Sequence, residues 1–381
     1  MRFRLNWLSL TLSIFALVAL ALPVVSVRQS RISLAEPRSL TETFGAGGWA
    51  VALSVLAVSA ALLFVQRPRL RLALICLASP GLLLLAGLGA REAAVGLGPY
   101  ARVAPGAAVW VWLAVMIVAF SDALTRPGLG GWHRSLATFF VLGAAAAIFV
   151  AGLIDPLSVV VEYRARADSF QQELKTHILL ALGSFGLAFA LGFPLGLWLE
   201  KRPTARGPVL SILTGVQTVP SIAMFGLMIV PLGWLAAHVP GAAAIGASGI
   251  GFAPAFLALL LYSLLPVLAN TLAGVQSVAP EVDEAARAMG MDDRQRRWLV
   301  TLPLAAPVIL LGARVVLVQN IGLATVGALI GAGGLGTYVF QGLAQGAMDL
   351  VLLGALPTVF LAIAFAALLD TIIMAIQGGR G

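Results

Sequence analysis

Ten long apolar runs divide this sequence and restrict what it can fold into. A helix needs about 20 apolar residues to cross the hydrocarbon core of a bilayer. The chain of 381 residues is 60% hydrophobic and 10% charged, whereas a soluble domain is roughly half apolar and about 25% charged. Because lipid offers no partner for free backbone groups, runs of this length predict an all-α fold, a polytopic membrane helix bundle with about ten transmembrane helices. The runs cover 6–27, 48–65, 70–88, 106–121, 135–153, 178–199, 208–235, 252–274, 303–325 and 350–376.

The basic residues predict how the spans are oriented. Cytoplasmic loops of membrane proteins carry an excess of Lys and Arg, so the net charge of +8 indicates positive loops rather than nucleic-acid binding. If loops alternate and the first lies inside, 15 Lys and Arg fall inside and 8 outside. This bias predicts a multi-pass protein of the bacterial inner membrane with both termini in the cytoplasm. The inside group is Arg2, Arg4, Arg67, Arg69, Arg71, Arg126, Arg134, Lys201, Arg202, Arg206, Arg287, Arg294, Arg296, Arg297 and Arg380, and the outside group is Arg28, Arg31, Arg38, Arg91, Arg102, Arg164, Arg166 and Lys175.

The first run also has a second interpretation. A basic start, an apolar core and small residues near Ala19, Ala21 and Ser26 would suit a cleaved signal peptide. The apolar stretch is longer than the core of about 7–15 residues that such a peptide needs, so we expect a retained span. Cleavage would leave the orientation of the other spans unchanged.

The spans differ in polarity between the two halves of the chain. We expect an N-terminal five-span extension at 1–153, an outside linker at 154–177 and a second five-span core at 178–381. Only the second block carries amide and guanidinium side chains at membrane depth, where polar groups are costly and usually face a bundle interior or a water-filled path. The same side chains can also join helices to one another. The candidates for a translocation path are Gln217, Thr218, Pro220, Ser221, Asn270, Arg314 and Asn320.

Several kinds of chemistry are absent from the sequence. It has no GxxxxGK[ST] loop for nucleotide phosphates, its three histidines lack metal-site spacing, and its single cysteine, Cys76, excludes an intrachain disulfide. Residues 331–336 match GxGxxG, but apolar helical sequence precedes them where a dinucleotide site needs a strand. We therefore expect a close-packed break between two membrane helices there, no cofactor or metal bound by this chain, and no enzymatic reaction of its own.

The inside loop at 275–303 is the most informative segment. Pro280 suits the first position of a helix, and acidic residues follow in the first turn, where they complement the helix dipole. Gly290 suits a C-terminal cap, and Asp292 or Asp293 can cap a second helix before Pro303 starts the next span. The pattern predicts a short helix, a glycine corner and a second helix at the cytoplasmic surface.

This loop resembles the EAA loop of ABC-transporter permeases, with the pattern EAA, three residues, G, nine residues and I-x-L-P. Glu284-Ala285-Ala286 is followed by Gly290 at the required spacing, and Val300, Leu302 and Pro303 are in register, with valine in place of isoleucine. The resemblance implies a coupling helix that docks in a groove of a separate ATPase subunit. The residues that it assigns to this loop are Glu284, Ala285, Ala286, Arg287 and Gly290.

The second block is similar to one branch of that family. Gln217-Thr218-Val219-Pro220-Ser221 followed by Phe225-Gly226 resembles a segment of osmoprotectant permeases, which import glycine betaine, choline or carnitine. The GAGGLG segment at 331–336 fits that branch but is shared with importers of methionine and other amino acids. The first block has no counterpart in the shortest members and resembles an extended form with extra N-terminal spans.

These resemblances imply an ABC importer subunit that works by alternating access. Its expected partners are ATPase subunits that bind ATP and Mg, a second permease copy or related permease, an extracytoplasmic solute-binding protein and membrane lipid. An amino acid such as methionine is the alternative cargo. A secondary transporter driven by an ion gradient and a membrane scaffold are alternatives from other classes, which the EAA spacing and the intramembrane polar residues disfavour.

Arg314 carries the sharpest expectation within the spans. It follows Pro303 by eleven residues, which at 1.5 Å per residue brings it roughly 16 Å along the helix. A guanidinium near mid-membrane must be paired or hydrated, and Asp370 on the last span is a possible partner. The side chain either holds the bundle together or faces the path, and the sequence leaves both interpretations open.

Overall fold

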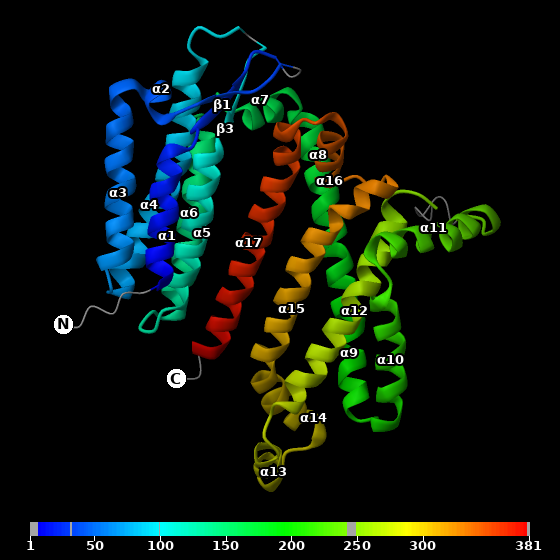
Figure 1. Cartoon of the computed structure of the whole chain (residues 1–381). Coiled ribbons are helices and arrows are strands. Elements are labelled where there is room, and N and C mark those ends of the chain that lie inside the picture. Colours follow the sequence, from blue (N-terminus) through cyan, green and yellow to red (C-terminus); the bar gives the residue numbers. More distant parts are fainter. Residues whose placement is uncertain (1–6, 31–32, 99, 242–248, 379–381) are drawn as a thin grey trace. The chain divides into compact units, whose positions relative to one another are not determined.

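The computed structural model describes residues 7–30, 33–98, 100–241 and 249–378. Arg2, Arg4, Arg31 and Arg380, used in the orientation argument, lie outside these ranges. The chain forms two compact units, Met1–Arg166 and Ala167–Gly381, which we call unit 1 and unit 2. Each unit consists mainly of long helices (Figure 1).

Nine helical segments among the described residues are long and apolar enough to cross a membrane. The shorter apolar helix Trp7–Ala21 comes before them. The predicted polytopic helix bundle with about ten spans is confirmed.

Unit 1 is a bundle whose first helix is part of its core. Ser9, Ser13 and Ala16 of this helix are buried, and the indole Nε1 of Trp112 donates to the backbone oxygen of Ala16 at 2.9 Å. The first helix is therefore tied to the fifth by a buried hydrogen bond. The helices are α1 (Trp7–Val18), α2 (Leu40–Phe44), α3 (Gly48–Phe64), α4 (Pro68–Ala94), α5 (Ala107–Thr125), α6 (Gly131–Val150) and α7 (Ser158–Ala165).

A three-stranded antiparallel sheet, which the sequence analysis did not predict, lies at one end of unit 1 (Figure 1). It consists of β1 (Val25–Arg28), β2 (Glu36–Arg38) and β3 (Arg102–Pro105) in the order β2-β1-β3. Ser26 pairs with Pro37 on one side and with Ala104 on the other. The sheet pairs a hairpin, which lies between α1 and α2, with a strand that directly precedes α5.

Unit 2 is built around helices that approach closely through small residues. A Cβ atom added to Gly196 of α9 would lie 2.9 Å from Thr271 of α12, so these backbones could not pack as they do with a larger residue. The helices are α8 (Ala167–Ile178), α9 (Ser184–Glu200), α10 (Pro203–Thr218), α11 (Ser221–His238), α12 (Phe252–Gln276), α13 (Pro280–Ala288), α14 (Asp293–Gln295), α15 (Leu302–Ala324), α16 (Gly336–Gln345) and α17 (Met348–Gly378).

Several short segments of other helical types connect these helices. Leu179–Gly183 (η3) joins α8 to α9 as a π-helix, and Arg296–Thr301 (η4) joins α14 to α15 in the same form. Val326–Ile330 (η5) is a 3-10 turn. Val219 and Pro220 divide the single run predicted at 208–235 into α10 and α11, because proline lacks the N–H that a continuous helix would use.

Candidate functional site

The predicted layout of the loop at 275–303 is confirmed. Pro280 is the first residue of α13, with Glu281 and Asp283 in its first turn. Gly290 has a φ of +82°, a conformation that glycine adopts without strain, and it turns the chain after the helix. Asp292 caps α14: its carboxylate accepts from the backbone N–H of Gln295 at 2.7 Å, while the Gln295 side chain accepts from Asp292 N–H at 2.9 Å.

The residues that the EAA resemblance assigns to coupling divide between the two faces of α13. Ala286 is 1% exposed and packs inward, whereas Glu284, Ala285, Arg287 and Gly290 are exposed. The small methyl group of Ala285 leaves the helix backbone accessible between charged neighbours. The exposed strip can therefore fit closely against another protein surface.

Arg296 holds α13 in place, a role that the sequence analysis did not assign to it. Its Nη1 donates to Asp283 of α13 at 3.0 Å, and its Nη2 bonds Asp293 of α14. The Arg296 side chain is only 10% exposed. One buried guanidinium thus fixes the angle between the two helices of the loop.

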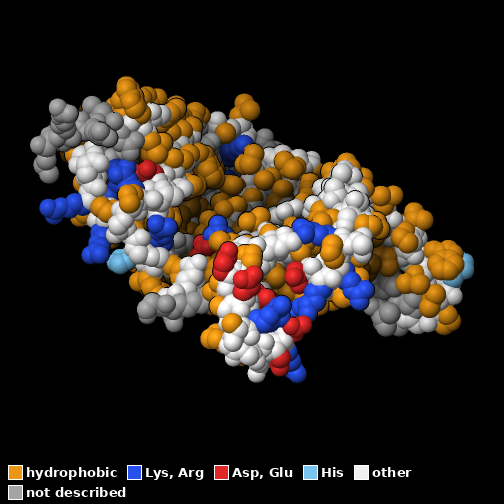
Figure 2. Space-filling model, turned by 90° about the horizontal axis from the view of Figure 1, so that it is seen from below, with side chains coloured by type: hydrophobic (Ala, Val, Ile, Leu, Met, Phe, Trp, Pro, Cys, Tyr) orange, Lys and Arg blue, Asp and Glu red, His pale blue; other side chains and the backbone are white. Residues whose placement is uncertain are grey.

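A second set of polar contacts connects this loop region to the turn between α9 and α10. Arg297 lies 4.0 Å from Glu200, and Arg206 donates to the side-chain oxygen of Gln276 at 3.3 Å. Both turns lie at the same end of unit 2 (Figure 1). Seen from that end, charged side chains of both signs cover the part that projects furthest (Figure 2).

The break between α10 and α11 is fastened to α12. Gln217 donates to the backbone oxygen of Tyr262 at 2.8 Å, and the Tyr262 hydroxyl donates back to the backbone oxygen of Val219. Thr218 bonds within its own helix, to Gly215 O at 2.7 Å. Pro220 precedes the first residue of α11, Ser221. Four of the path candidates therefore lie together at one helix break.

The two asparagines serve contacts between or within helices. Asn320 is 1% exposed; its amide donates to the Ser184 hydroxyl at 3.0 Å and accepts from the Ser263 hydroxyl at 2.9 Å, so it joins α15 to α9 and α12. Asn270 donates to Pro266 O at 2.7 Å and lies against Gly312, where an added Cβ would be 2.2 Å from the Asn270 side chain.

Arg314 of α15 forms an ion pair with Asp370 of α17, so the expected pairing of this membrane arginine is found. The two side chains are 36% and 40% exposed. The pair thus links two helices while remaining open on one side.

The glycine-rich segment at 331–336 is a close-packed turn, as predicted. Gly331, Gly333 and Gly334 have φ values of +75°, +76° and +84°, which L-residues rarely adopt. A Cβ on Gly336 would lie 1.9 Å from the backbone oxygen of Thr325. The carboxylate of Glu173 on α8 accepts from Gly334 N–H, which ties the turn to that helix.

Comparison with known proteins agrees with this architecture. A family profile described as "Binding-protein-dependent transport system inner membrane component" matches residues 192–378, and one described as "ABC transporter permease YehY, N-terminal domain" matches residues 4–160. The osmoprotectant import permease protein OsmW of Salmonella typhimurium is 41% identical over 187 residues, which are 49% of this chain and 82% of that protein. The choline transport system permease protein OpuBB of Bacillus subtilis is 36% identical over 49% of this chain and 79% of that protein. An inward-facing structure of the MetNI methionine ABC transporter is 22% identical, with a TM-score of 0.48, over 54% of this chain and 95% of that one.

The two family profiles and the sequence relatives define a class, the permease subunits of ABC transporters. The chain belongs to the family of binding-protein-dependent transport system inner membrane components, with a YehY-like N-terminal domain. It is a multi-pass, non-catalytic membrane subunit, and a separate ATPase binds the nucleotide. The resemblance inferred from the EAA loop is confirmed.

Proposed function

We propose that this chain is the permease of an ATP-driven importer for osmoprotectants, small quaternary ammonium solutes such as glycine betaine, choline and carnitine. The relatives carry this proposal: besides OsmW and OpuBB, the glycine betaine/carnitine/choline permease OpuCB of Bacillus subtilis is 34% identical over 79% of its length. Because permeases named for several such solutes are similarly identical to this chain, the relatives favour the solute class rather than any one solute.

We further propose that α13 is the contact through which the ATPase drives the spans. Its exposed strip of Glu284, Ala285, Arg287 and Gly290 is the surface that the EAA resemblance assigns to docking. Arg296 would transmit a displacement of α13 to η4 and α15, since its guanidinium bonds acids on both sides of the corner. A rigid connection of this kind lets an external event bias two arrangements of a helix bundle.

Charge supports an orientation with the α13 end in the cytoplasm. Seven of the nine Lys and Arg in 167–378 lie in the two turns at that end, as the positive-inside rule requires of a cytoplasmic side. A solute-binding protein would then approach from the opposite side, and a second permease copy or a related permease would complete the path. The same rule would place the α3–α4 and α5–α6 turns of unit 1 in the cytoplasm.

The path itself would pass the break between α10 and α11. Gln217, Thr218, Pro220 and Ser221 interrupt the apolar helix surface there. Arg314 of α15 adds a charge that is partly exposed. Asn270 and Asn320 would border it less directly, because their amides are used in helix contacts.

Reconstitution tests the cargo. The permease, its ATPase and its binding protein are placed in liposomes, and uptake and ATP hydrolysis are measured with glycine betaine, choline, carnitine and methionine. We expect the three quaternary ammonium solutes to stimulate both activities, with methionine at the background level. Stimulation by methionine alone would contradict the proposal, and a complex that hydrolyses ATP confirms that the preparation is active.

A further inference from the structure

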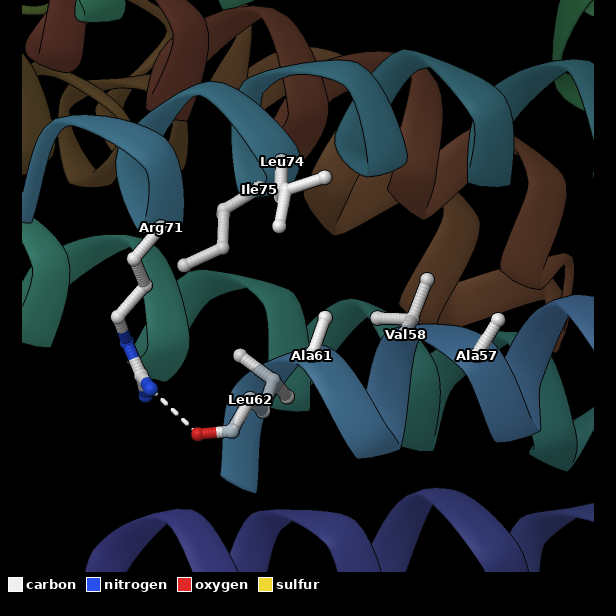
Figure 3. Close-up of a pocket in the computed structure, with 7 residues that line it drawn as sticks. All are labelled: Ala57, Val58, Ala61, Leu62, Arg71, Leu74 and Ile75. Carbon is white, nitrogen blue, oxygen red and sulfur yellow. Dashed lines mark hydrogen bonds between the residues drawn. The ribbon is translucent and has the colours of Figure 1, made fainter. Parts of the chain in front are cut away.

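Unit 1 contains a small apolar cavity between two of its membrane helices. The cavity has a volume of about 150 Å³ and is lined by Ala57, Val58, Ala61, Leu62, Arg71, Leu74 and Ile75. Alanines on α3 face the larger side chains of α4 across it (Figure 3). The mouth is on the outer surface of the bundle, because Ala57 is exposed and Leu74 is 36% exposed.

Arg71 closes one end of the cavity and carries a donor that is left over. Its Nη1 donates to Leu62 O (Figure 3), and its Nη2 lies 3.0 Å from the Ser9 hydroxyl and 3.2 Å from Asp122. Its Nε–H is buried and has no acceptor among the described residues. Unsatisfied buried donors are rare and costly, which favours an acceptor beside Arg71.

The same end of unit 1 has a strong excess of positive charge. Within the described residues it carries five arginines and one aspartate, and Asp122 is already shared by Arg71 and Arg126. Arg67 and Arg69, at the start of α4, are exposed, and Arg67 lies one helical turn before Arg71, whose backbone N–H donates to Arg67 O at 2.9 Å. The turn between α5 and α6 lies beside them, since Gly128 approaches Pro68, and Arg134 is exposed in the first turn of α6 that follows. An anion would be held here by several guanidinium groups at once.

We propose that this groove is a binding site for an anionic glycerophospholipid. One acyl chain would lie between α3 and α4 against the alanines, an ester carbonyl would accept from the Nε–H of Arg71, and the phosphate would lie among Arg67, Arg69 and Arg134. The apolar groove, the free donor and the basic rim occur in the order in which acyl chain, ester and phosphate follow one another in such a lipid. The proposal concerns unit 1 alone and holds whatever solute unit 2 transports.

The test measures lipid retained by the purified full-length protein in native mass spectrometry after exchange into dioleoyl-phosphatidylglycerol or dioleoyl-phosphatidylcholine. We expect the native chain to keep one phosphatidylglycerol and to lose phosphatidylcholine. Ala57→Phe fills the groove and should lower retention roughly tenfold. The double substitution Arg67→Gln and Arg69→Gln should do the same, since each surface cation contributes a few-fold to binding of an anionic lipid.

Two matched controls separate this site from general effects. Ala60→Phe adds the same ring to an exposed position of α3 outside the groove, and Arg91→Gln removes an exposed arginine from the other end of α4. Both should retain phosphatidylglycerol as the native chain does. Unchanged retention in Ala57→Phe, or equal retention of both lipids, would overturn the proposal. Competition by glycerol 3-phosphate at the same concentration as phosphatidylglycerol would also overturn it, because the acyl chain would then add nothing.

Discussion

Each unit keeps an arginine among its membrane helices, and the two arginines are satisfied in different ways. Arg71 in unit 1 is 1% exposed, and its guanidinium bonds groups on α1, α3 and α5, with Asp122 among them. Arg314 in unit 2 is 36% exposed and is paired with one residue, Asp370 of α17.

The difference indicates that the two arginines have different roles. A charge in lipid is costly, and the bonds of its two terminal nitrogens to groups on three helices make Arg71 a fixed joint of the bundle. The Arg314 pair is joined on one side and open on the other, an arrangement suited to meeting a solute, a second chain or water. We therefore expect unit 1 to stabilise the protein and unit 2 to carry the movements of transport.

The largest effect is expected from replacing Arg71, because the comparison assigns it a structural role. Arg71→Leu leaves buried acceptors on α1 and α3 without a donor, which should cost about 3 kcal/mol of stability. The melting temperature of the purified protein should fall by roughly 5–10 °C. Arg69→Leu, at an exposed position two residues away, serves as the control and should melt within about 2 °C of the native protein. An unchanged melting temperature in Arg71→Leu would remove its structural role.

The corresponding change in unit 2 should affect transport. Arg314→Leu is expected to leave the complex assembled and hydrolysing ATP, while solute uptake in proteoliposomes falls at least roughly tenfold, as expected when a charged group is lost from a path. Arg314→Lys should restore uptake in part, because lysine keeps the charge but not the planar fork.

Two results would contradict a role of Arg314 in the path. Loss of assembly together with uptake in Arg314→Leu would assign Arg314 to holding α15 against α17. Full uptake by the leucine variant would remove it from the path. Asp370→Asn, which keeps the shape of the partner, should reproduce the milder lysine phenotype if the open side of the pair is what matters.

A third test concerns the contact between α13 of unit 2 and the ATPase. Glu284→Lys and Gly290→Asp change the exposed strip of α13 and should each lower co-purification of the ATPase several-fold; Gly290→Asp also strains a residue at φ +82° by about 1 kcal/mol. Asp168→Lys makes a similar change of charge at an exposed residue of α8, at the other end of unit 2, and should leave co-purification intact. Native levels of ATPase in both α13 variants would contradict the docking role.

The smallest effect is expected from removing unit 1 altogether. A chain that begins at Ala167 behind a cleavable signal sequence should keep measurable uptake, because the polar residues of the proposed path all lie in unit 2. Its melting temperature should be lower than that of the full chain. A truncated protein that assembles with the ATPase and yet transports nothing would show that unit 1 takes part in transport.

Local features of unit 2 could be predicted because their causes are close in sequence. The start of α13 follows from Pro280, its end from Gly290, and the next helix from the cap at Asp292. The glycine turn at 331–336 was also predictable, since three of its residues need positive φ values. Apolar runs of sufficient length predicted the bundle.

Contacts between distant segments could not be predicted in the same way. The sheet of unit 1 pairs strands of three and four residues, and β1 and β3 are separated by more than 70 positions, so neither shows a recognisable alternation. Arg71 meets Ser9 from 62 positions away. The bond between Gln217 and Tyr262 that holds the α10–α11 break likewise depends on packing of α12.

The π-helical segment η4 has a consequence for insertions and deletions in this part of the gene. A π-turn closes through i→i+5 bonds and so contains one residue more than the α-helical turn that it replaces. Deleting one residue of 296–301 would convert this turn to an α-helical one and leave α13 and α15 in nearly the same relative orientation, whereas deleting a second would rotate everything that precedes it by about 100° relative to α15. Glu284 would then leave the exposed side. The π-helical turn therefore gives the nine residues between Gly290 and Val300 a tolerance of one deletion, and a second deletion would move the exposed side of α13.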